Sequence, residues 1–301
     1  MRILLFGKDG QLGGALRHSL APLASPGGLR ALGRADADLA DAAALRACVR
    51  DWRPEVIVNA AAYTAVDRAE TEQALAHSVN ALAPGVLAEE AQACGAWLVH
   101  YSTDYVFDGS KGGPYLETDP ANPLSVYGRT KLEGEQRIRA SGARHLLLRT
   151  GWVFGRQGAN FPKSILQLAR QRQAFDVVAD QVGAPTSAQL LADATALALQ
   201  RIASAGDAAP SLSGTYHLAA AGQTSWHAYA CHVLAQAQAH GAQLLATPER
   251  IAAVPASRWR AAAQRPANSL LDTAKFRATF GLALPDWRLH VNLLIAELVK
   301  P

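Results

Sequence analysis

This sequence of 301 residues has few of the features that mark extracellular, zinc-binding or membrane proteins. Its three cysteines, Cys48, Cys94 and Cys231, lie far apart and are odd in number. They form no CxxC pair and no zinc-ligand spacing, which argues against a disulfide framework and indicates a reducing compartment. No stretch approaches the run of about eighteen apolar residues that a membrane span needs. The apolar run at residues 3–6 is too short for a signal peptide, so we expect a cytoplasmic protein.

The chain also lacks a concentration of charge of one sign. It has 29 Lys and Arg residues against 25 Asp and Glu residues, a formal net charge of +4, and the basic residues are scattered. Nucleic-acid binding needs a basic patch, so we expect neither nucleic acid nor a membrane among the partners. A mildly positive chain still suits a small phosphorylated substrate.

The pattern of apolar residues predicts an α/β fold. Half of the residues are hydrophobic and 18% are charged, which is typical of a globular protein of one large or two joined domains. Predicted strands occupy residues 3–6, 29–32, 56–58, 97–101 and 146–148. Predicted helices occupy residues 11–20, 41–50, 67–93 (with a break at Pro84) and 123–140. Continuous apolar strands separated by helices indicate a parallel sheet covered on both faces, the doubly wound Rossmann fold.

After residue 150 the alternation of apolar strands and helices is less regular. We predict helices near residues 161–171, 188–202 and 226–239, with short strands near 175–178 and 215–218. The chain therefore divides into an NAD(P)-binding Rossmann domain (1–150) and a smaller, mainly substrate-binding α/β region (151–301). The segments near 175–205 and 215–240 are candidates to pack back on the first domain.

A glycine-rich turn joins the first predicted strand to the first predicted helix. It reads GKDGQLG and places glycines at positions 7, 10 and 13. Such a turn lets the backbone approach a phosphate, and the free N–H groups of the helix start favour a pyrophosphate. Gly7, Gly10 and Gly13 therefore predict a dinucleotide site, with an unliganded tight turn as the alternative.

The end of the second predicted strand bears on the choice of cofactor. An NAD site usually has a carboxylate there for the ribose 2′-OH, whereas this strand ends in Gly33 and Arg34. A guanidinium suits a 2′-phosphate, so Arg34 favours NADPH, with NADH as the alternative. The competing interpretation is a solvated arginine. Asp38 lies just beyond and is expected near the adenine end.

Tyr127 and Lys131 stand four residues apart on a predicted helix and therefore share one face. A free phenol titrates near pH 10, too high for ready proton exchange at neutral pH. We expect the ammonium of Lys131 to lower the pKa of Tyr127 and make the pair an acid–base catalyst. Ser102 or Thr103, at the end of the fourth predicted strand, would hold a substrate oxygen beside the phenol. The alternative for each hydroxyl is a local backbone bond.

These motifs resemble the extended short-chain dehydrogenase/reductases and, within them, the family of dTDP-4-dehydrorhamnose reductases. The matching stretches run through nearly the whole chain: residues 7–13, 58–67, 101–107, 123–131, 149–154, 180–186 and 265–269. The resemblance implies NADPH- or NADH-dependent reduction of the C4 ketone of dTDP-4-dehydro-L-rhamnose to dTDP-L-rhamnose, a donor of a bacterial surface sugar.

The resemblance also implies a role for individual residues. The cofactor would contact Gly7, Gln11 and Leu12 with its pyrophosphate, Asp38, Leu39, Ala61, Ala62, Tyr63 and Thr64 with its adenosine side, and Tyr101. Tyr127 would protonate O4, Lys131 would hold the nicotinamide ribose, and Thr103 would orient the ketone. Asp104 and Trp152 would contact the sugar, and Arg265 the substrate diphosphate. The alternative for Arg265 is a structural salt bridge, and Trp226, Trp259 and Trp287 are expected in the core or an interface.

Three other functions compete with the reductase. A sugar-nucleotide dehydratase needs a further carboxylate beside the catalytic threonine, where this chain has Tyr105. An epimerase would keep Tyr127 and Lys131, and a non-catalytic regulator would keep the fold without needing a tuned phenol. Some relatives dimerise through magnesium held partly by an acid on the first helix. Residues 11–20 contain no acid, so we expect no metal and a monomer or weak homodimer.

Overall fold

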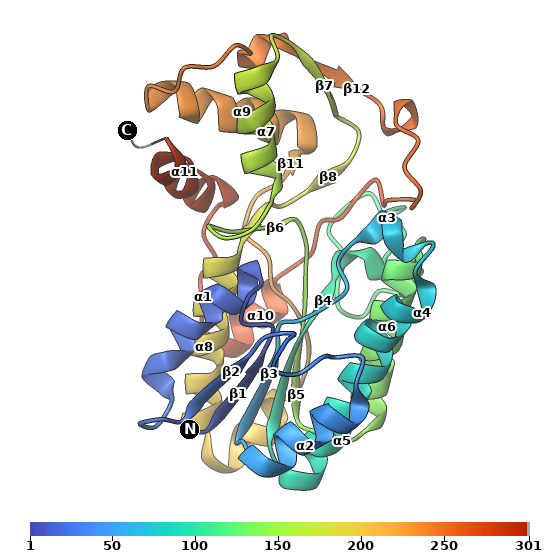
Figure 1. Ribbon diagram of the computed structural model, residues 1–301, viewed down its shortest axis with the longest axis vertical. Coiled ribbons are helices and arrows are strands. Elements are labelled where there is room, and N and C mark those ends of the chain that lie inside the picture. The colour runs from blue at the N-terminus through green and yellow to red at the C-terminus, as the bar shows by residue number, and fades with distance from the viewer. Residues whose placement is uncertain (300–301) are drawn as a thin grey trace.

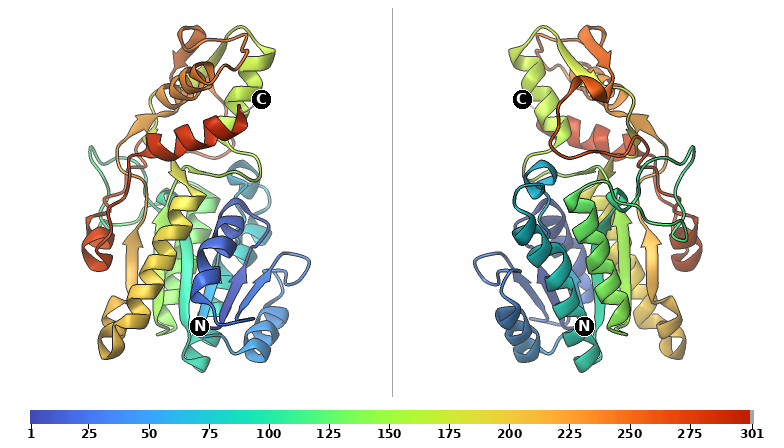
Figure 2. Two further views of the ribbon diagram at one scale, coloured as in Figure 1. Left: turned by 90° about the vertical axis from the view of Figure 1, so that its left-hand side faces the viewer. Right: turned by 90° about the vertical axis from the view of Figure 1, so that its right-hand side faces the viewer.

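The computed structural model describes residues 1–299 as an elongated molecule with two parts. The lower part in Figure 1 is built around a parallel sheet, and the upper part consists of helices and short strands. The N-terminus lies at the foot of the lower part and the C-terminal helix in the upper part, as both views of Figure 2 show. No helix within residues 1–299 is long and apolar enough to cross a membrane.

The central sheet has six strands in the order β10-β5-β4-β3-β1-β2, and all neighbours are parallel. The strands are β1 (Ile3–Phe6), β2 (Leu29–Leu32), β3 (Val56–Asn59), β4 (Trp97–Thr103), β5 (His145–Thr150) and β10 (Gly214–His217). The chain leaves β1 in one direction for β2 and returns past it to β3. This switch point opens a crevice at the carboxyl ends of the strands, where ligands bind in doubly wound folds. The predicted Rossmann fold is confirmed.

Helices cover both faces of this sheet (Figure 1). One face packs under α1 and α8, and the other under α2, α5 and α6. Alternation along β1 places Ile3 and Leu5 in the first core and Leu4 and Phe6 in the second. The helices of the lower part are α1 (Gln11–Leu20), α2 (Ala42–Trp52), α3 (Val66–Ala69), α4 (Gln73–His77), α5 (Ala83–Cys94), α6 (Val126–Ala140), α8 (Ala188–Ser204) and α10 (Ala274–Phe280).

The helix predicted for residues 67–93 is interrupted, but not at Pro84 as expected. The segment breaks after α3, and a π-helical turn, Ser78–Leu82, separates α4 from α5. Pro84 has no N–H and its ring crowds the carbonyl of Asn80, so the helix widens directly before it. The helix predicted from residue 123 begins at Val126 instead, because the Ser125 side chain accepts the N–H of Gly128 and caps it.

The upper part packs around a hydrophobic core of its own, separate from the two cores on the faces of the sheet. Its helices are α7 (Phe161–Gln171), α9 (Trp226–Ala239) and α11 (Trp287–Leu298), and its strand pairs are β7 (Phe175–Val178) with β12 (Ile251–Val254), β8 (Val182–Gly183) with β11 (Thr224–Ser225), and β6 (Val153–Phe154) with β9 (Thr186–Ser187). The chain crosses between the parts more than once. Of the segments that we expected to pack back on the first domain, α8 and β10 lie in the lower part, whereas α9 packs against α7 and α11.

A row of buried polar side chains crosses the sheet beneath α6. We call Asn59, His100, Ser102, Arg149 and His217 the polar row; each is at most 4% exposed. Strand register places them side by side, because Asn59 pairs with His100, Ser102 with Arg149, and Arg149 with His217. They meet two charged residues of α6, Lys131 and Glu135.

Glu135 neutralises one end of this row. Its carboxylate accepts from Ser102 at 2.6 Å and from the Arg149 guanidinium at 2.9 and 2.7 Å, with Glu135 fully buried. A buried ion pair offsets its desolvation cost only where well-aligned hydrogen bonds accompany it, as these do for the carboxylate. The pair therefore ties α6 to β4 and β5.

We predict that Glu135→Ala lowers the free energy of unfolding by about 3–5 kcal/mol, because it leaves the Arg149 charge buried without its partner. Glu133→Ala is the matched control on the same helix. Its partner Arg137 lies four residues on and both side chains are partly exposed to solvent, so we expect a loss below about 1 kcal/mol. Urea unfolding of the three proteins measures both values. Equal losses would contradict the structural importance of the buried pair.

Candidate active site

A cavity of about 810 Å³ lies at the carboxyl ends of β1 to β5. Apart from Gly13, every residue predicted to bind the cofactor lines it: Gly7, Gly10, Gln11, Leu12, Arg34, Asp38, Leu39, Ala61, Ala62, Tyr63, Thr64, Tyr101, Tyr127 and Lys131. Thr103, Asp104 and Trp152 line it too. Residues from seven separate stretches of sequence thus surround one cleft, which we call the main cleft.

The glycine turn forms a cradle at one end of the main cleft. Gly7 has a φ of +90°, and a Cβ atom there would lie 2.7 Å from the backbone nitrogen of Ala61. A Cβ atom on Gly13 would lie 1.8 Å from the Gly7 carbonyl oxygen. Only glycine allows both approaches, which bring the N-terminus of α1 against β1 and β3. Because no side chain caps α1, its first N–H groups are left for an anion.

Charged side chains surround the end of β2. The Arg34 side chain is 77% exposed and contacts Asp38 at 3.3 Å, so it can turn toward a ligand. A tight turn brings a carboxylate back to the strand end: Asp36 accepts the N–H of Gly33 at 2.8 Å and pairs with Lys8. The expectation that no acid stands there is therefore wrong. The Lys8 charge neutralises that acid, and the exposed Arg34 is the cation able to turn toward a phosphate.

Tyr127 and Lys131 both face the main cleft, as the four-residue spacing predicts. The Thr103 hydroxyl contacts the Tyr127 phenol and donates to Asp104 at 2.9 Å. The N–H of Tyr105 in turn donates to the Thr103 hydroxyl at 3.1 Å, which holds its orientation. Ser102 donates to Glu135 instead, so Thr103 is the hydroxyl beside the phenol.

The pKa of Tyr127 moves in the direction opposite to the predicted one. Burial raises it to about 12, outweighing the hydrogen bond with Thr103 that lowers it. Lys131 does not offset this, because its ammonium donates to the Tyr101 carbonyl at 2.6 Å and contacts the His100 ring. Burial lowers the pKa of Lys131 to about 8. At neutral pH the phenol is therefore protonated and the ammonium is largely charged.

Two further residues predicted to contact ligands, Tyr101 and Asp104, are already held by contacts within the protein. The Tyr101 hydroxyl shares a 2.6 Å hydrogen bond with Thr195 of α8, so only its ring and carbonyl border the main cleft. Asp104 is buried behind Thr103, and this burial raises its pKa to about 6. A carboxyl group with such a pKa is partly protonated near neutral pH and is able to donate as well as accept.

The upper part closes the main cleft with aromatic residues. Trp152 has a φ of 50°, rare for a residue with a side chain, and its ring stacks on Trp226 with centroids 3.5 Å apart. Trp226 lines the main cleft while it packs against the core of the upper part, and Trp287 is buried in that core. The exposed Trp259 borders a second cavity of about 560 Å³, to which Tyr105 and Trp226 also contribute.

Arg265 borders that second cavity and makes the salt bridge that the sequence leaves as its alternative role. Its guanidinium donates to the Asp67 carboxylate at 2.7 and 3.2 Å, joining the upper part to α3. These hydrogen bonds lower the pKa of Asp67. A contact of Arg265 with a substrate diphosphate remains a prediction.

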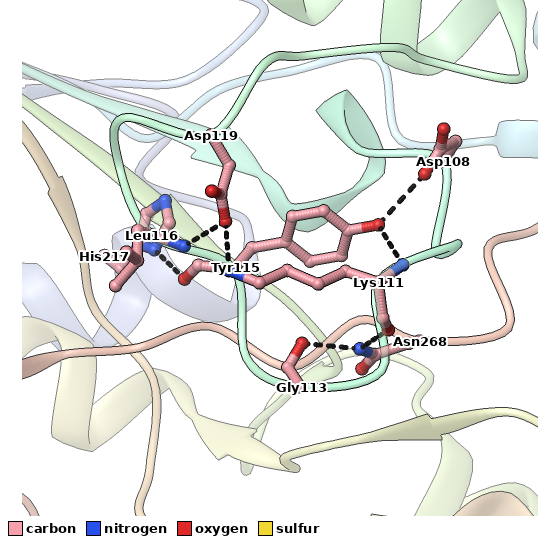
Figure 3. A network of polar contacts seen from close by, with 8 residues as sticks. All are labelled: Asp108, Lys111, Gly113, Tyr115, Leu116, Asp119, His217 and Asn268. Carbon is pink, nitrogen blue, oxygen red and sulfur yellow. Dashed lines mark hydrogen bonds and ion pairs between the residues drawn. The ribbon is translucent and has the colours of Figure 1, made fainter.

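The neighbouring segment is anchored to the loop that follows β4 (Figure 3). The Asn268 amide donates to the carbonyls of Lys111 and Gly113, both at 2.8 Å. In the same loop, the Tyr115 carbonyl contacts the ring of His217 at 3.0 Å. The loop, the C-terminal segment and the sheet edge are thereby held together beside Asp104.

Sequence reasoning missed the residues that support the adenosine side. Asn80, fully buried in the π-helical turn, accepts the N–H of Tyr63 at 2.9 Å and donates to its carbonyl at 3.0 Å. The Tyr63 hydroxyl donates to Glu72 at 2.6 Å. An asparagine inside an apolar helical stretch is the one signal that could have revealed this support.

Comparison with known proteins agrees with this geometry. The family model described as RmlD substrate binding domain matches residues 1–300. A dTDP-4-dehydrorhamnose reductase of Salmonella typhimurium is 46% identical over 302 residues, covering 99% of this chain and 98% of that protein. The solved dTDP-4-dehydrorhamnose reductase of Clostridium acetobutylicum is 31% identical with a TM-score of 0.90 and full coverage of both chains. That of Bacillus anthracis, in complex with NADP, is 31% identical with a TM-score of 0.87, covering 98% of this chain and 99% of the other.

We predict that Arg34→Ala weakens the binding of NADPH about tenfold and leaves that of NADH nearly unchanged, because the guanidinium would meet only the 2′-phosphate. Fluorescence titration of each nucleotide against the purified protein gives the ratio of the two dissociation constants. Arg201→Ala, on the exposed face of α8, is the control for loss of one positive charge. An unchanged ratio in Arg34→Ala would remove this residue from the cofactor site.

Proposed function

The chain belongs to the family of dTDP-4-dehydrorhamnose reductases, and we propose that it reduces the C4 ketone of dTDP-4-dehydro-L-rhamnose to dTDP-L-rhamnose with NADPH. NADH is the alternative reductant. The observation that carries the proposal is the meeting of Thr103, Tyr127 and Lys131 at the main cleft, opposite a glycine turn that suits a dinucleotide. Matched family motifs along the whole chain support the substrate.

The residues of the main cleft fit a bound dinucleotide. The cradle at Gly7 and Gly13 has no room for a side chain, and the free N–H groups of α1 suit the pyrophosphate. Asp38, Leu39, Ala61, Ala62, Tyr63 and Thr64 would border the adenosine, and Lys131 the nicotinamide ribose. When bound, NADPH supplies the hydride that carbon C4 of the sugar takes up.

Tyr127 would donate the proton that oxygen O4 needs. Its raised pKa keeps the phenol protonated at neutral pH, as a proton donor requires. The phenolate left behind is unfavourable in a buried site, and the Lys131 ammonium one helical turn away would stabilise it. Thr103, held by Asp104 and the Tyr105 N–H, would orient the ketone and the phenol.

The sugar nucleotide would run from the main cleft into the second cavity. Asp104 and the stacked Trp152 would contact the sugar beside Tyr127. The two cavities share Tyr105 and Trp226, so a nucleotide attached to that sugar would extend toward Arg265. There a guanidinium would bind the diphosphate through paired hydrogen bonds. Oligomeric state, a monomer or weak homodimer, remains a prediction.

The rival functions differ in what the cleft must contain. A dehydratase needs a carboxylate where Tyr105 stands, and a phenol does not replace it. A regulator needs neither a buried Lys131 nor a hydroxyl at Thr103. An epimerase would use the same Tyr127 and Lys131, so only its products separate it from a reductase.

The direct test is oxidation of NADPH by the purified protein with a panel of 4-keto sugar nucleotides. We expect stoichiometric loss of NADPH absorbance with dTDP-4-dehydrorhamnose and formation of dTDP-L-rhamnose. Stereoisomeric products without net NADPH loss would indicate an epimerase. Tight NADPH binding with no turnover on any member of the panel would favour the regulator.

We further predict that Tyr127→Phe folds and binds NADPH like the parent but loses 10²- to 10⁴-fold in kcat, the usual effect of removing a proton donor (an order-of-magnitude estimate). Tyr216→Phe is the control, because that hydroxyl donates to the Leu212 carbonyl away from the main cleft. Steady-state kinetics at saturating NADPH measures both variants. Near-normal turnover in Tyr127→Phe would overturn the acid assignment.

A further inference from the structure

The ammonium of Lys131 contacts the buried imidazole of His100. Lys131 and His100 are each 1% exposed, and the distance from Lys131 Nζ to His100 Nε2 is 3.1 Å. On the far side of the ring, His100 Nδ1 lies 3.1 Å from the side-chain nitrogen of Asn59. The Asn59 side-chain oxygen accepts the N–H of Ala61 at 3.2 Å. A continuous chain of polar contacts therefore joins Lys131 to the backbone of Ala61, which follows β3 and borders the main cleft.

This arrangement places two hydrogen-bond donors against one acceptor. A neutral imidazole carries one N–H and one lone pair, whereas both the ammonium of Lys131 and the amide nitrogen of Asn59 donate. The His100 ring stays neutral, because burial and the Lys131 charge hold the pKa of His100 well below its usual value. Only one neighbour is therefore able to donate to His100 at a time.

Each tautomer of the ring corresponds to one charge state of Lys131. With Lys131 charged, Nε2 must accept from the ammonium, Nδ1 carries the proton, and the Asn59 amide turns its oxygen to the ring. With Lys131 neutral, Nε2–H donates to the amine and the amide keeps its bond to Ala61. Turning the amide also releases the N–H of Ala61, which borders the main cleft.

We propose that His100 is a positioning residue for Lys131: it accepts one ammonium hydrogen bond, keeps the charge beside Tyr127, and changes tautomer when that charge is lost. The role of His100 rests on the proposed function only in its expected effect on the pH dependence of kcat. The Lys131 ammonium has three N–H groups. The Tyr101 carbonyl and His100 hold two of them, which leaves the third for the main cleft.

The charged groups around Lys131 leave His100 a distinct contribution. From α6 itself, Glu135 raises the pKa of Lys131, but its carboxylate is shared with Arg149 of β5 and Arg139 of α6. Tyr127 is neutral at physiological pH. From β4 and β3, the neighbours are uncharged: the Tyr101 carbonyl, His100 and Asn59. His100 is therefore the side chain whose lone pair directly favours the charged form.

The kinetic test compares His100→Phe with His100→Gln in the complete chain. Phenylalanine fills the space without an acceptor, so the alkaline fall in kcat, expected near the pKa of Lys131 of about 8, should move to lower pH by about one unit. Glutamine offers an amide oxygen near the position of Nε2 and should return the fall toward its original pH. His145→Gln, at the far end of β5, is the control and should leave the profile unmoved.

A purely structural role for His100 predicts a different result. It would lower kcat by the same factor at every pH, or only reduce the folded fraction, without moving the alkaline fall. Such a uniform loss in His100→Phe, or a profile in His100→Gln no closer to the parent than that of His100→Phe, overturns the proposal. The KM for NADPH measured alongside shows whether the effect lies in binding or in turnover.

A second measurement needs no substrate and follows the unaltered protein. The unaltered protein labelled with ¹⁵N-histidine is titrated by NMR from pH 6 to 10, with His100 assigned by its absence in His100→Gln. We expect the proton to pass from Nδ1 to Nε2 with a midpoint near that of Lys131, about 8. One tautomer throughout overturns the proposal. Because this experiment is independent of sugar nucleotides, its failure is distinct from failure of the reductase assignment.

Discussion

The burial of the Lys131 ammonium is the constraint on which the lower part depends. An isolated charge in such a place would be very costly, so the fold must supply partners from every side. The Tyr101 carbonyl and the His100 ring come from β4, and the field of Glu135 comes from α6 itself. Close packing makes these contacts possible: a Cβ atom on Gly134 of α6 would lie 2.2 Å from the Asn80 carbonyl.

The polar row beneath α6 distributes that charge over the sheet. At one end, Glu135 and Arg149 form a buried ion pair joined by two hydrogen bonds. At the other, Asn59 and His100 are neutral, and we propose that they respond to Lys131 by a turn of the amide and a change of tautomer in the ring. The same helix face thus combines a fixed electrostatic anchor with a group able to lose its proton near pH 8. The contacts at both ends of the polar row fix α6 so that Lys131 and Tyr127 lie where the strands end. Ligands bind at this edge of the sheet in doubly wound folds.

Neither part of the molecule contains a complete site. The lower part provides the glycine turn, Thr103, Tyr127 and Lys131, and the upper part provides Trp226 and Arg265. The Asp67–Arg265 pair and the anchoring of Asn268 join the two parts beside the cleft. In the proposed function, the lower part would transfer the proton, and both parts would contact the substrate.

The sequence by itself determined the features that depend on near neighbours: the strands and most helices, the glycine turn, the shared helix face of Tyr127 and Lys131, and the family. Local periodicity and spacing are sufficient for these. Only the tertiary structure decided the pairing of Arg265 with Asp67, the return of Asp36 to the end of β2, the contact of His100 with Lys131 and the raised pKa of Tyr127. Most of these groups are remote in sequence, and even the return of Asp36 depends on a turn and on Lys8 of another segment. Burial and hydrogen bonding depend on which surfaces the folded chain brings together, and no spacing along the sequence encodes that.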